Sequence, residues 1–176
     1  MIQFFHKIID VLDRLDIPYM LSGSIAMGIY AVPRSTRDFD FVIHLKKSDV
    51  VNFSAEFKND YYCDIDAIND ALTRHSIFNI IDPTSGYKAD FIILKPEEYR
   101  QAEFNRRKQI DFLDKKIYIV SAEDLILSKL IWIQDYQMAV QMEDIKTILS
   151  NDSIDFDYIS TWIEKLDLKT FDLFPI

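Results

Sequence analysis

The strand predicted over residues 38–45 most constrains the fold of this chain, because acidic and apolar residues alternate at its start. Successive side chains of a β-strand point to opposite faces, so Asp38 and Asp40 share one face while Phe39 and Phe41 share the other. The apolar residues indicate a strand that belongs to a hydrophobic core. Two carboxylates this close repel each other unless a cation or a proton lies between them. The segment therefore predicts a core strand whose polar face carries a functional site.

Composition favours one domain, or one domain with a helical appendage. The 176 residues are 49% hydrophobic and include 13 Phe and 9 Tyr, which is enough for a packed core. Only 3 Gly and 5 Pro argue against disorder. No apolar run reaches the length of a membrane span and the N-terminus lacks a signal-peptide layout, so we expect a cytoplasmic protein with no membrane partner.

Cysteine, histidine and charge exclude several classes of site. The single Cys63 excludes an intrachain disulfide and a cysteine-rich zinc site, and the three histidines have no ligand spacing. A net charge of -9 argues against extended nucleic-acid binding, which needs cations to neutralise phosphates. One basic cluster, Arg100 with Arg106, Arg107 and Lys108, is predicted late in a helix. It is either a solvated helix end, where cations suit the helix dipole, or a local polyanion contact.

Hydrophobic spacing and turn signals predict that strands and helices mix up to about residue 120 and that helices alone follow. This pattern predicts an α+β fold, with a core over 1–120 and a C-terminal helical part over 121–176 that packs on it as one compact unit. The expected helices cover 2–15, 25–30, 48–57, 67–74, a segment from 96, a segment from 121, 139–149 and 158–166. The expected strands cover 17–21, 38–45, 78–81, 88–94 and a hairpin of 110–112 with 117–120.

Several polar residues are predicted to begin helices. Ser22 or Ser24 is placed to cap the helix over 25–30, and Ser48 the helix through residue 57. Asp64 and Asp66 form a second acidic pair, but they precede a helical pattern. Since helix N-termini favour Asp, capping is the better account of this pair than metal binding.

A third acid, Asp90, lies near the start of another apolar strand. If the two strands are neighbours, Asp38, Asp40 and Asp90 converge on one site. A buried cluster of three acids is costly without a bound divalent cation or raised pKa values. Ligands that are all oxygen suit Mg²⁺ or Mn²⁺, which keep several waters and bind phosphates as remaining ligands. Such ions can activate an attacking oxygen and stabilise a leaving pyrophosphate.

The spacing Gly23-Ser24, a helix, then Arg34-x-Thr36-x-Asp38-x-Asp40 resembles the signature of the DNA polymerase β-like nucleotidyltransferase superfamily. The resemblance implies a nucleotidyltransferase-type mixed sheet flanked by helices. It also implies that the Gly-Ser turn helps to hold the phosphates of a nucleoside triphosphate. In the superfamily the Asp-x-Asp pair binds the metals together with a later strand Asp, a position that Asp90 matches by context.

The layout of Ser121-Ala-Glu-Asp-Leu-Ile-Leu-x-Lys129 and the later Asp144 is similar to that of the AbiEii-like bacterial nucleotidyltransferases. This group includes toxins of toxin–antitoxin pairs, so an antitoxin protein is a further expected partner. The resemblance implies that Lys129 and Asp144 belong to the active-site cleft. It implies a magnesium- or manganese-dependent transfer of a nucleoside monophosphate from a triphosphate to a hydroxyl of a protein, a tRNA end or a small molecule.

Four of these residues also have simpler interpretations. Arg34 either touches nucleotide phosphates or pairs with Asp38 or Asp40. Thr36 either has a direct role or turns the chain locally. Lys129 either binds phosphate or extends to solvent from an apolar helix. Asp144 is either a cleft residue or a helix-surface acid that pairs with Lys146 or Lys129.

Two rival hypotheses for the whole chain remain open. The first is a catalytically degenerate nucleotide-binding or toxin–antitoxin interaction module with the same fold. It is favoured by Gln137, Met138 and Gln141, which stand where charged residues are expected. The second is a structural scaffold in which Asp38 and Asp40 pair with Arg34 and Arg37.

Overall fold

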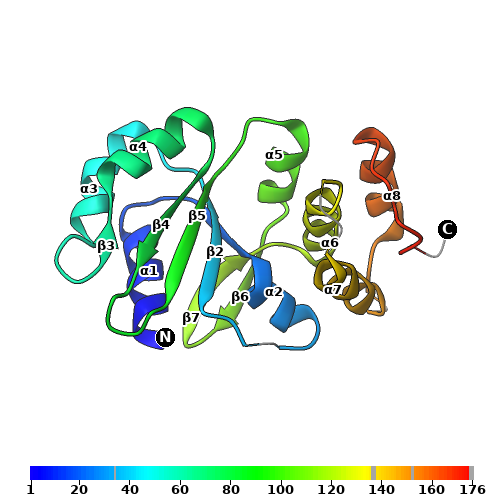
Figure 1. Cartoon of the computed structure of the whole chain (residues 1–176), viewed down its shortest axis with the longest axis horizontal. Coiled ribbons are helices and arrows are strands. Elements are labelled where there is room, and N and C mark those ends of the chain that lie inside the picture. The colour runs from blue at the N-terminus through cyan, green and yellow to red at the C-terminus, as the bar shows by residue number, and fades with distance from the viewer. Residues whose placement is uncertain (34, 136–137, 152, 175–176) are drawn as a thin grey trace.

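The computed structural model describes residues 1–33, 35–135, 138–151 and 153–174. Within these ranges one 7-stranded sheet has the order β3-β4-β5-β2-β1-β7-β6 (Figure 1). The strands are β1 (Tyr19–Ser22), β2 (Asp38–Ile43), β3 (Tyr62–Cys63), β4 (Ile77–Ile81), β5 (Lys88–Ile93), β6 (Lys108–Phe112) and β7 (Lys115–Ile119). The helices are α1 (Ile2–Arg14), α2 (Gly23–Tyr30), the 3₁₀ helix η1 (Lys47–Asp49), α3 (Val50–Ala55), α4 (Ile65–Arg74), α5 (Glu98–Asn105), α6 (Ala122–Trp132), α7 (Ala139–Leu149) and α8 (Phe156–Lys165).

The strand with alternating acids lies at the centre of the sheet. β2 pairs in parallel with β5 on one side and antiparallel with β1 on the other. β1 pairs in parallel with β7, whereas β3–β4, β4–β5 and β6–β7 are antiparallel. The sheet is therefore mixed and flanked by helices, which confirms the predicted α+β class.

Two hydrophobic clusters lie on opposite faces of the sheet. On one face, aromatic residues of the central strands pack against α1, α3 and α4. Phe91 lies at the centre of this aromatic cluster. Its ring centroid is 5.6 Å from that of Phe41 and 5.1 Å from that of Phe78, and both pairs of rings are stacked. On the other face, Met20 belongs to a second cluster with α2 and α5 to α8. The odd-numbered apolar residues of β2 thus anchor the strand and leave its even-numbered residues on the α2 side.

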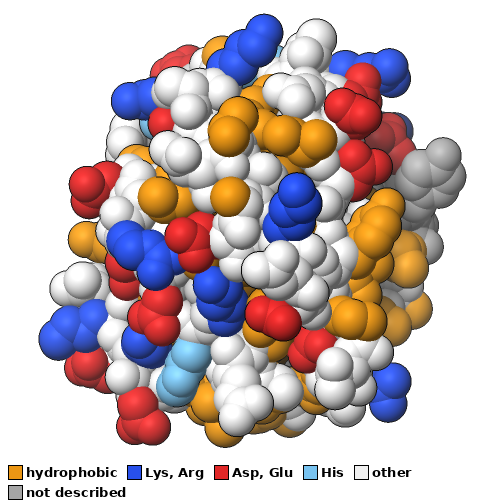
Figure 2. Space-filling model, turned by 90° about the vertical axis from the view of Figure 1, so that its left-hand side faces the viewer, with side chains coloured by type: hydrophobic (Ala, Val, Ile, Leu, Met, Phe, Trp, Pro, Cys, Tyr) orange, Lys and Arg blue, Asp and Glu red, His pale blue; other side chains and the backbone are white. Residues whose placement is uncertain are grey.

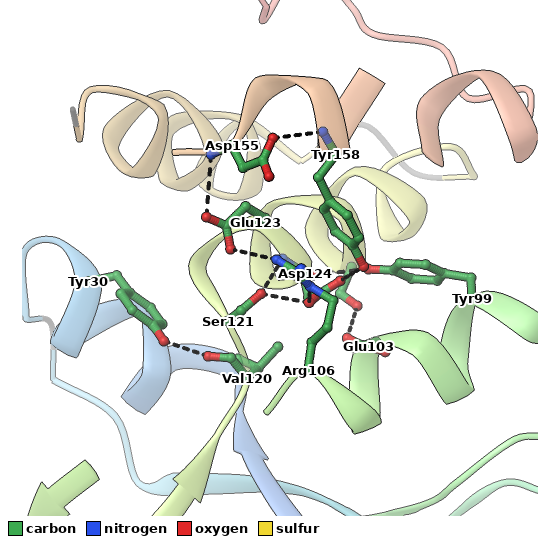
Figure 3. A network of polar contacts seen from close by, with 11 residues as sticks. Tyr30, Tyr99, Glu103, Arg106, Val120, Ser121, Glu123, Asp124, Asp155 and Tyr158 are labelled. Carbon is green, nitrogen blue, oxygen red and sulfur yellow. Dashed lines mark hydrogen bonds and ion pairs between the residues drawn. The ribbon is translucent and has the colours of Figure 1, made fainter. Parts of the chain in front are cut away.

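A buried polar network joins the sheet to the C-terminal helices (Figure 3). Ser121 caps α6, since its Oγ accepts the backbone N–H of Asp124 at 3.1 Å and donates to the Asp124 carboxylate at 2.6 Å. Asp124 is fully buried and also accepts from the Tyr158 hydroxyl of α8 at 2.7 Å and from Arg106 Nε at 3.1 Å. The helix predicted from residue 121 is confirmed with Ser121 as its N-cap, and Asp124 of the same motif links α6 to α8.

The basic cluster is only in part the solvated helix end that one interpretation proposed, because two of its arginines form ion pairs with buried acids. α5 ends at Asn105, and Arg106 to Lys108 lie beyond it. Arg106 lies 3.7 Å from the centre of the Tyr158 ring and pairs with both Glu123 and Asp124. Arg107 stacks on Phe104, and Arg100 pairs with the buried Glu103 at 2.9 Å. Arg106 is thus a counter-ion to two acids that are distant in sequence, whereas Arg100 pairs with an acid on its own helix.

Caps and turns were predicted with mixed success. Asp64 caps α4 as expected, with its Oδ1 accepting the N–H of Asp66 at 2.8 Å. Ser48 is not an N-cap, because it lies inside η1 and the following Asp49 accepts the Lys46 N–H instead. The β6–β7 turn is made by Leu113 and Asp114 alone, both at positive φ, the backbone form that two-residue hairpins favour.

Charges of both signs share the surface shown in Figure 2, where acidic and basic side chains are interspersed with small apolar groups. Ion pairs such as that of Lys7 with Glu56 at 3.2 Å contribute to this kind of surface. None of the helices in the described part of the chain is both long and apolar enough to cross a membrane.

Candidate functional site

A row of polar residues crosses the centre of the sheet on the face opposite the aromatic cluster. The parallel register of β2 and β5 places Asp40 directly beside Asp90. On the outer sides, β1 places Ser22 beside Asp40 and β4 places Asn79 beside Asp90. The two acids therefore lie on neighbouring strands and on one face, the condition on which their predicted convergence depended.

Asp38 lies one step further along the same face, beside Lys88. Lys88 Nζ lies 2.8 Å from Asp90 Oδ2 and 3.8 Å from Asp38 Oδ1. Asn79 Nδ2 donates to the other oxygen of Asp90 at 2.6 Å. Both oxygens of Asp90 thus have partners, and Lys88 partly neutralises two of the three acids. The third acid, Asp40, accepts a hydrogen bond from the backbone of α2.

The first turn of α2 lies directly against Asp40. Gly23 has φ 62°, and a Cβ built on it would overlap the Asp40 carboxylate. The backbone N–H of Ser24 donates a hydrogen bond to the same carboxylate. Only glycine permits both the positive φ and this close approach. The N-terminal end of a helix favours negative charge. The predicted Gly-Ser turn and the predicted Asp-x-Asp pair therefore belong to one site, in which the N-terminal end of α2 faces the Asp40 carboxylate.

The environment disfavours a negative charge on Asp40. Burial raises the pKa of its carboxyl, and the charges of Asp90 and Asp38 raise it further, whereas the Ser24 N–H and Lys88 lower it. The pKa of Lys88 is raised, chiefly by its hydrogen bond with Asp90 and by the surrounding acids. Three carboxylates facing one ammonium leave an excess of negative charge at the site.

The donor set fits a magnesium or manganese ion, because the available ligands are carboxylate oxygens on one rigid sheet face. Within the described residues, no three Asp, Glu, His or Cys side chains are already grouped so as to hold a metal ion. Lys88 lies between Asp38 and Asp90 and pairs with an oxygen of Asp90. The residues that would hold the metal are Asp38, Asp40 and Asp90.

Thr36 shapes the entry into β2. Its Oγ1 accepts the backbone N–H of Asp38 at 3.1 Å, which is the local turn that one interpretation of the sequence proposed. Arg34, the other residue predicted in this segment, lies outside the described residues. A direct contact of Thr36 with nucleotide stays a prediction.

Lys129 and Asp144 form a buried ion pair between α6 and α7. Lys129 Nζ lies 2.7 Å from Asp144 Oδ2, and their side chains are only 7% and 9% exposed. Lys129 therefore does not extend to solvent. Asp144 pairs with Lys129, as one interpretation of the sequence proposed, but it is buried and not on the helix surface. Gln141 completes the group, because its Oε1 accepts from Lys129 Nζ at 2.9 Å. Gln137, the neighbour singled out with it, lies outside the described residues. The nucleotide contact predicted for Lys129 and Asp144 stays a prediction.

Two residues of the site were missed from the sequence, Asn79 and Lys88. Asn79 is the one polar residue of the otherwise apolar β4, and Lys88 precedes Asp90 by two positions on β5. A period of two places Lys88 on the same face as Asp90, so its nearness could have been predicted. The position of Asn79 depends on which strand β4 pairs with, which is a long-range property.

Comparison with protein-family models and with curated proteins finds no match. Among solved structures, that of the antibiotic-resistance factor ANT(2″)-Ia aligns over 94% of this chain and 90% of its own, with a TM-score of 0.63 and 12% identity. ANT(2″)-Ia in complex with adenylyl-2″-tobramycin gives a TM-score of 0.61 at 13% identity, over 94% and 96% of the two chains. The lincomycin-bound lincosamide adenylyltransferase LnuA gives 0.53 at 14% identity, over 85% and 95%. These matches show that the chain has the fold of nucleotidyltransferases.

Proposed function

We propose that this protein is a nucleotidyltransferase that uses Mg²⁺ or Mn²⁺ to move a nucleoside monophosphate from a triphosphate to a hydroxyl acceptor. One observation carries the proposal: Asp40 lies beside Asp90 and against the Gly23–Ser24 turn, with Asp38 on the same sheet face. The fold of known nucleotidyltransferases supports it.

The roles follow from the chemistry of each group. The acceptor oxygen forms a bond to the α-phosphorus, the bond between the α-phosphorus and the bridging oxygen breaks, and pyrophosphate leaves. Asp38, Asp40 and Asp90 would hold the metal, which would supply Lewis-acid stabilisation of the phosphates. Asp90 also accepts the acceptor's proton. Gly23 and Ser24 present backbone at the helix N-terminus to the β- and γ-phosphates.

A small hydroxyl-bearing molecule is the acceptor class best supported. The similar structures include adenylyltransferases bound to lincomycin and to an adenylylated tobramycin, and each aligns over most of its own length. The net charge of -9 argues against a long RNA acceptor. A narrower proposal, from the resemblance to AbiEii-like enzymes, makes the protein the cytoplasmic toxin of a toxin–antitoxin pair with an antitoxin protein as partner.

The test is transfer of label from α-³²P-labelled triphosphates with Mg²⁺ or Mn²⁺, presented separately with small-molecule, RNA and protein fractions of a cell extract. The variant D38A/D40A is expected to abolish metal-dependent transfer and pyrophosphate release while leaving the fold intact. The control D70A/D111A removes two exposed surface acids that pair with Arg74 and Lys116, and it is expected to keep full activity.

Calorimetry with each triphosphate, with and without Mg²⁺, distinguishes an active nucleotidyltransferase from the catalytically degenerate module. Triphosphate binding without turnover on any fraction would favour the catalytically degenerate module. Full activity of D38A/D40A would refute the assignment of the acids. The absence of any triphosphate binding would leave only the scaffold interpretation.

A further inference from the structure

We propose that Lys88 is a built-in counter-ion that occupies the cation position of this site until a nucleotide arrives, so that metal and triphosphate bind together rather than metal first. The inference rests on the proposed function and adds a residue and an order of binding to it. Lys88 matches none of the positions of the motif by which the site was recognised.

The position of Lys88 is that of a competing cation. Its ammonium lies 2.8 Å from Asp90 Oδ2 and 3.8 Å from Asp38 Oδ1, whereas these two acids and Asp40 are the proposed metal ligands. Asn79 holds the other Asp90 oxygen, so Asp90 offers a metal no oxygen without a hydrogen bond while Lys88 stays in place. A divalent ion that enters without a nucleotide must displace an attractive ion pair and then lies close to a positive charge.

Lys88 is also able to leave. Its side chain is 35% exposed, near the start of β5, and its four-carbon stem lets the ammonium move without moving the strand. A triphosphate brings several negative charges to the N-terminal end of α2, which lies against Asp40 on the same face. Lys88 then exchanges its carboxylate partners for phosphate oxygens, and the freed carboxylates bind the metal that accompanies the nucleotide.

This exchange couples the two ligands thermodynamically. If the nucleotide removes the cation that opposes the metal, it raises the affinity for the metal, and the metal raises the affinity for nucleotide by the same factor. Metal and triphosphate also bind each other directly, so their affinities are coupled even without Lys88. A lysine that only stabilised the fold would leave the coupling factor unchanged when it is removed. The change in the coupling factor, after correction for the Mn²⁺ that the nucleotide analogue binds without protein, therefore distinguishes the proposal from a structural ion pair.

The variant K88Q tests this, with K115Q as the matched control. Lys115 lies on β7, is similarly exposed and pairs with a single acid, Asp10 of α1. Both variants remove one unit of positive charge, but only K88Q removes it from the site. The readout is Mn²⁺ binding, measured by electron paramagnetic resonance of the free ion, with and without a non-hydrolysable ATP analogue.

The wild-type protein and K115Q are expected to bind Mn²⁺ weakly alone and much more tightly with the analogue. K88Q is expected to bind Mn²⁺ alone at least on the order of 10-fold more tightly than wild type, because one positive charge within about 4 Å of a divalent ion weakens binding by that much even at the dielectric constant of water. The ratio of the Mn²⁺ affinities of K88Q with and without the analogue is expected to be smaller than that of wild type. Adding D40N to K88Q is expected to abolish the gain, which places the ion at the acids.

A K88Q protein that binds Mn²⁺ no more tightly than K115Q, while all variants still bind Mn²⁺ with the analogue, overturns the role of Lys88 and leaves the proposed function standing. A wild-type protein that binds no Mn²⁺ even with the analogue overturns the proposed function itself. Thermal unfolding checks that each variant is folded. Mg²⁺ is expected to raise the melting temperature of K88Q more than that of K115Q.

Discussion

Replacing Gly23 by alanine tests whether glycine is needed at the start of α2 for its close approach to Asp40 or only for its positive φ. Gly23 and Gly86 both have positive φ, at 62° and 71°, where an L-residue is strained. A Cβ at Gly23 would overlap the carboxylate of Asp40, whereas a Cβ at Gly86 would lie 3.9 Å from Arg37 Nη1, an ordinary contact. G86A therefore has the same backbone strain without the clash.

The expected losses of stability follow from the backbone strain at positive φ and from the steric overlap with Asp40. A left-handed backbone costs an L-residue about 1–2 kcal/mol, and the loss of unfolded-state freedom returns about 0.4–1 kcal/mol of it. G86A should therefore lower the free energy of unfolding by roughly 1 kcal/mol. G23A adds an overlap that must push the Asp40 side chain aside, and such overpacking costs about 1–3 kcal/mol more. We expect a total loss of about 2–4 kcal/mol for G23A.

Activity should separate the two variants more sharply than stability. A displacement of about 1 Å in a positioned group can cost on the order of 100-fold in rate, so G23A should lose at least that much in metal-dependent nucleotide transfer. G86A should keep wild-type activity. Urea unfolding followed by circular dichroism gives the free energies, and pyrophosphate release gives the rates. If G23A is no less stable than G86A, or transfers nucleotide as fast, the close approach of Gly23 to Asp40 has been misjudged.

Two further predictions concern buried charges. K129M should destabilise the fold by up to about 3–5 kcal/mol because it removes the positive charge that lies 2.7 Å from the buried Asp144 carboxylate. The double variant K129M/D144L should recover most of this loss in urea unfolding, and a double variant no more stable than K129M would contradict the pairing. Burial raises the pKa of the Glu103 carboxyl, against the opposing effect of Arg100. Its ionised form is therefore penalised in the fold, a cost that is absent below pH 4.5 and fully present above the folded-state pKa. The stability of E103Q relative to wild type should accordingly rise with pH above 4.5, and a flat or falling difference across a pH series would refute this.

The local parts of the fold were predictable and the long-range parts were not. The alternation of acids and aromatics over Asp38–Phe41 predicted which face of β2 is buried, since a strand has a period of two whatever its neighbours. The cap at Asp64 was predictable for the same reason, because it involves only the next three residues. In contrast, the cap predicted at Ser48 was wrong, because Ser48 lies inside the 3₁₀ helix η1, which the sequence pattern did not predict.

The errors concern charges whose partners are distant in sequence. Arg106, which follows α5, pairs with Glu123 and Asp124, and these acids lie 17 and 18 residues later, so no local pattern predicts the pairing. The two-residue strand β3 is too short to show any periodicity. For the site, the spacing of Gly23, Asp38 and Asp40 predicted the residues that lie together, whereas the contribution of Asn79 depends on how β4 pairs with β5.

The two faces of β2 together explain how the fold tolerates this site. Three carboxylates on adjacent positions repel one another, and nothing in their own chemistry would hold β2 and β5 together. The opposite face supplies the attraction: the stacked rings of Phe41, Phe91 and Phe78 bury apolar area on the same strands that carry the acids. Lys88, Asn79 and the Ser24 N–H reduce what remains of the repulsion. The strands that carry the acids are thus held by contacts that do not depend on a ligand, and removal of the Lys88 side chain should change metal affinity without changing the sheet.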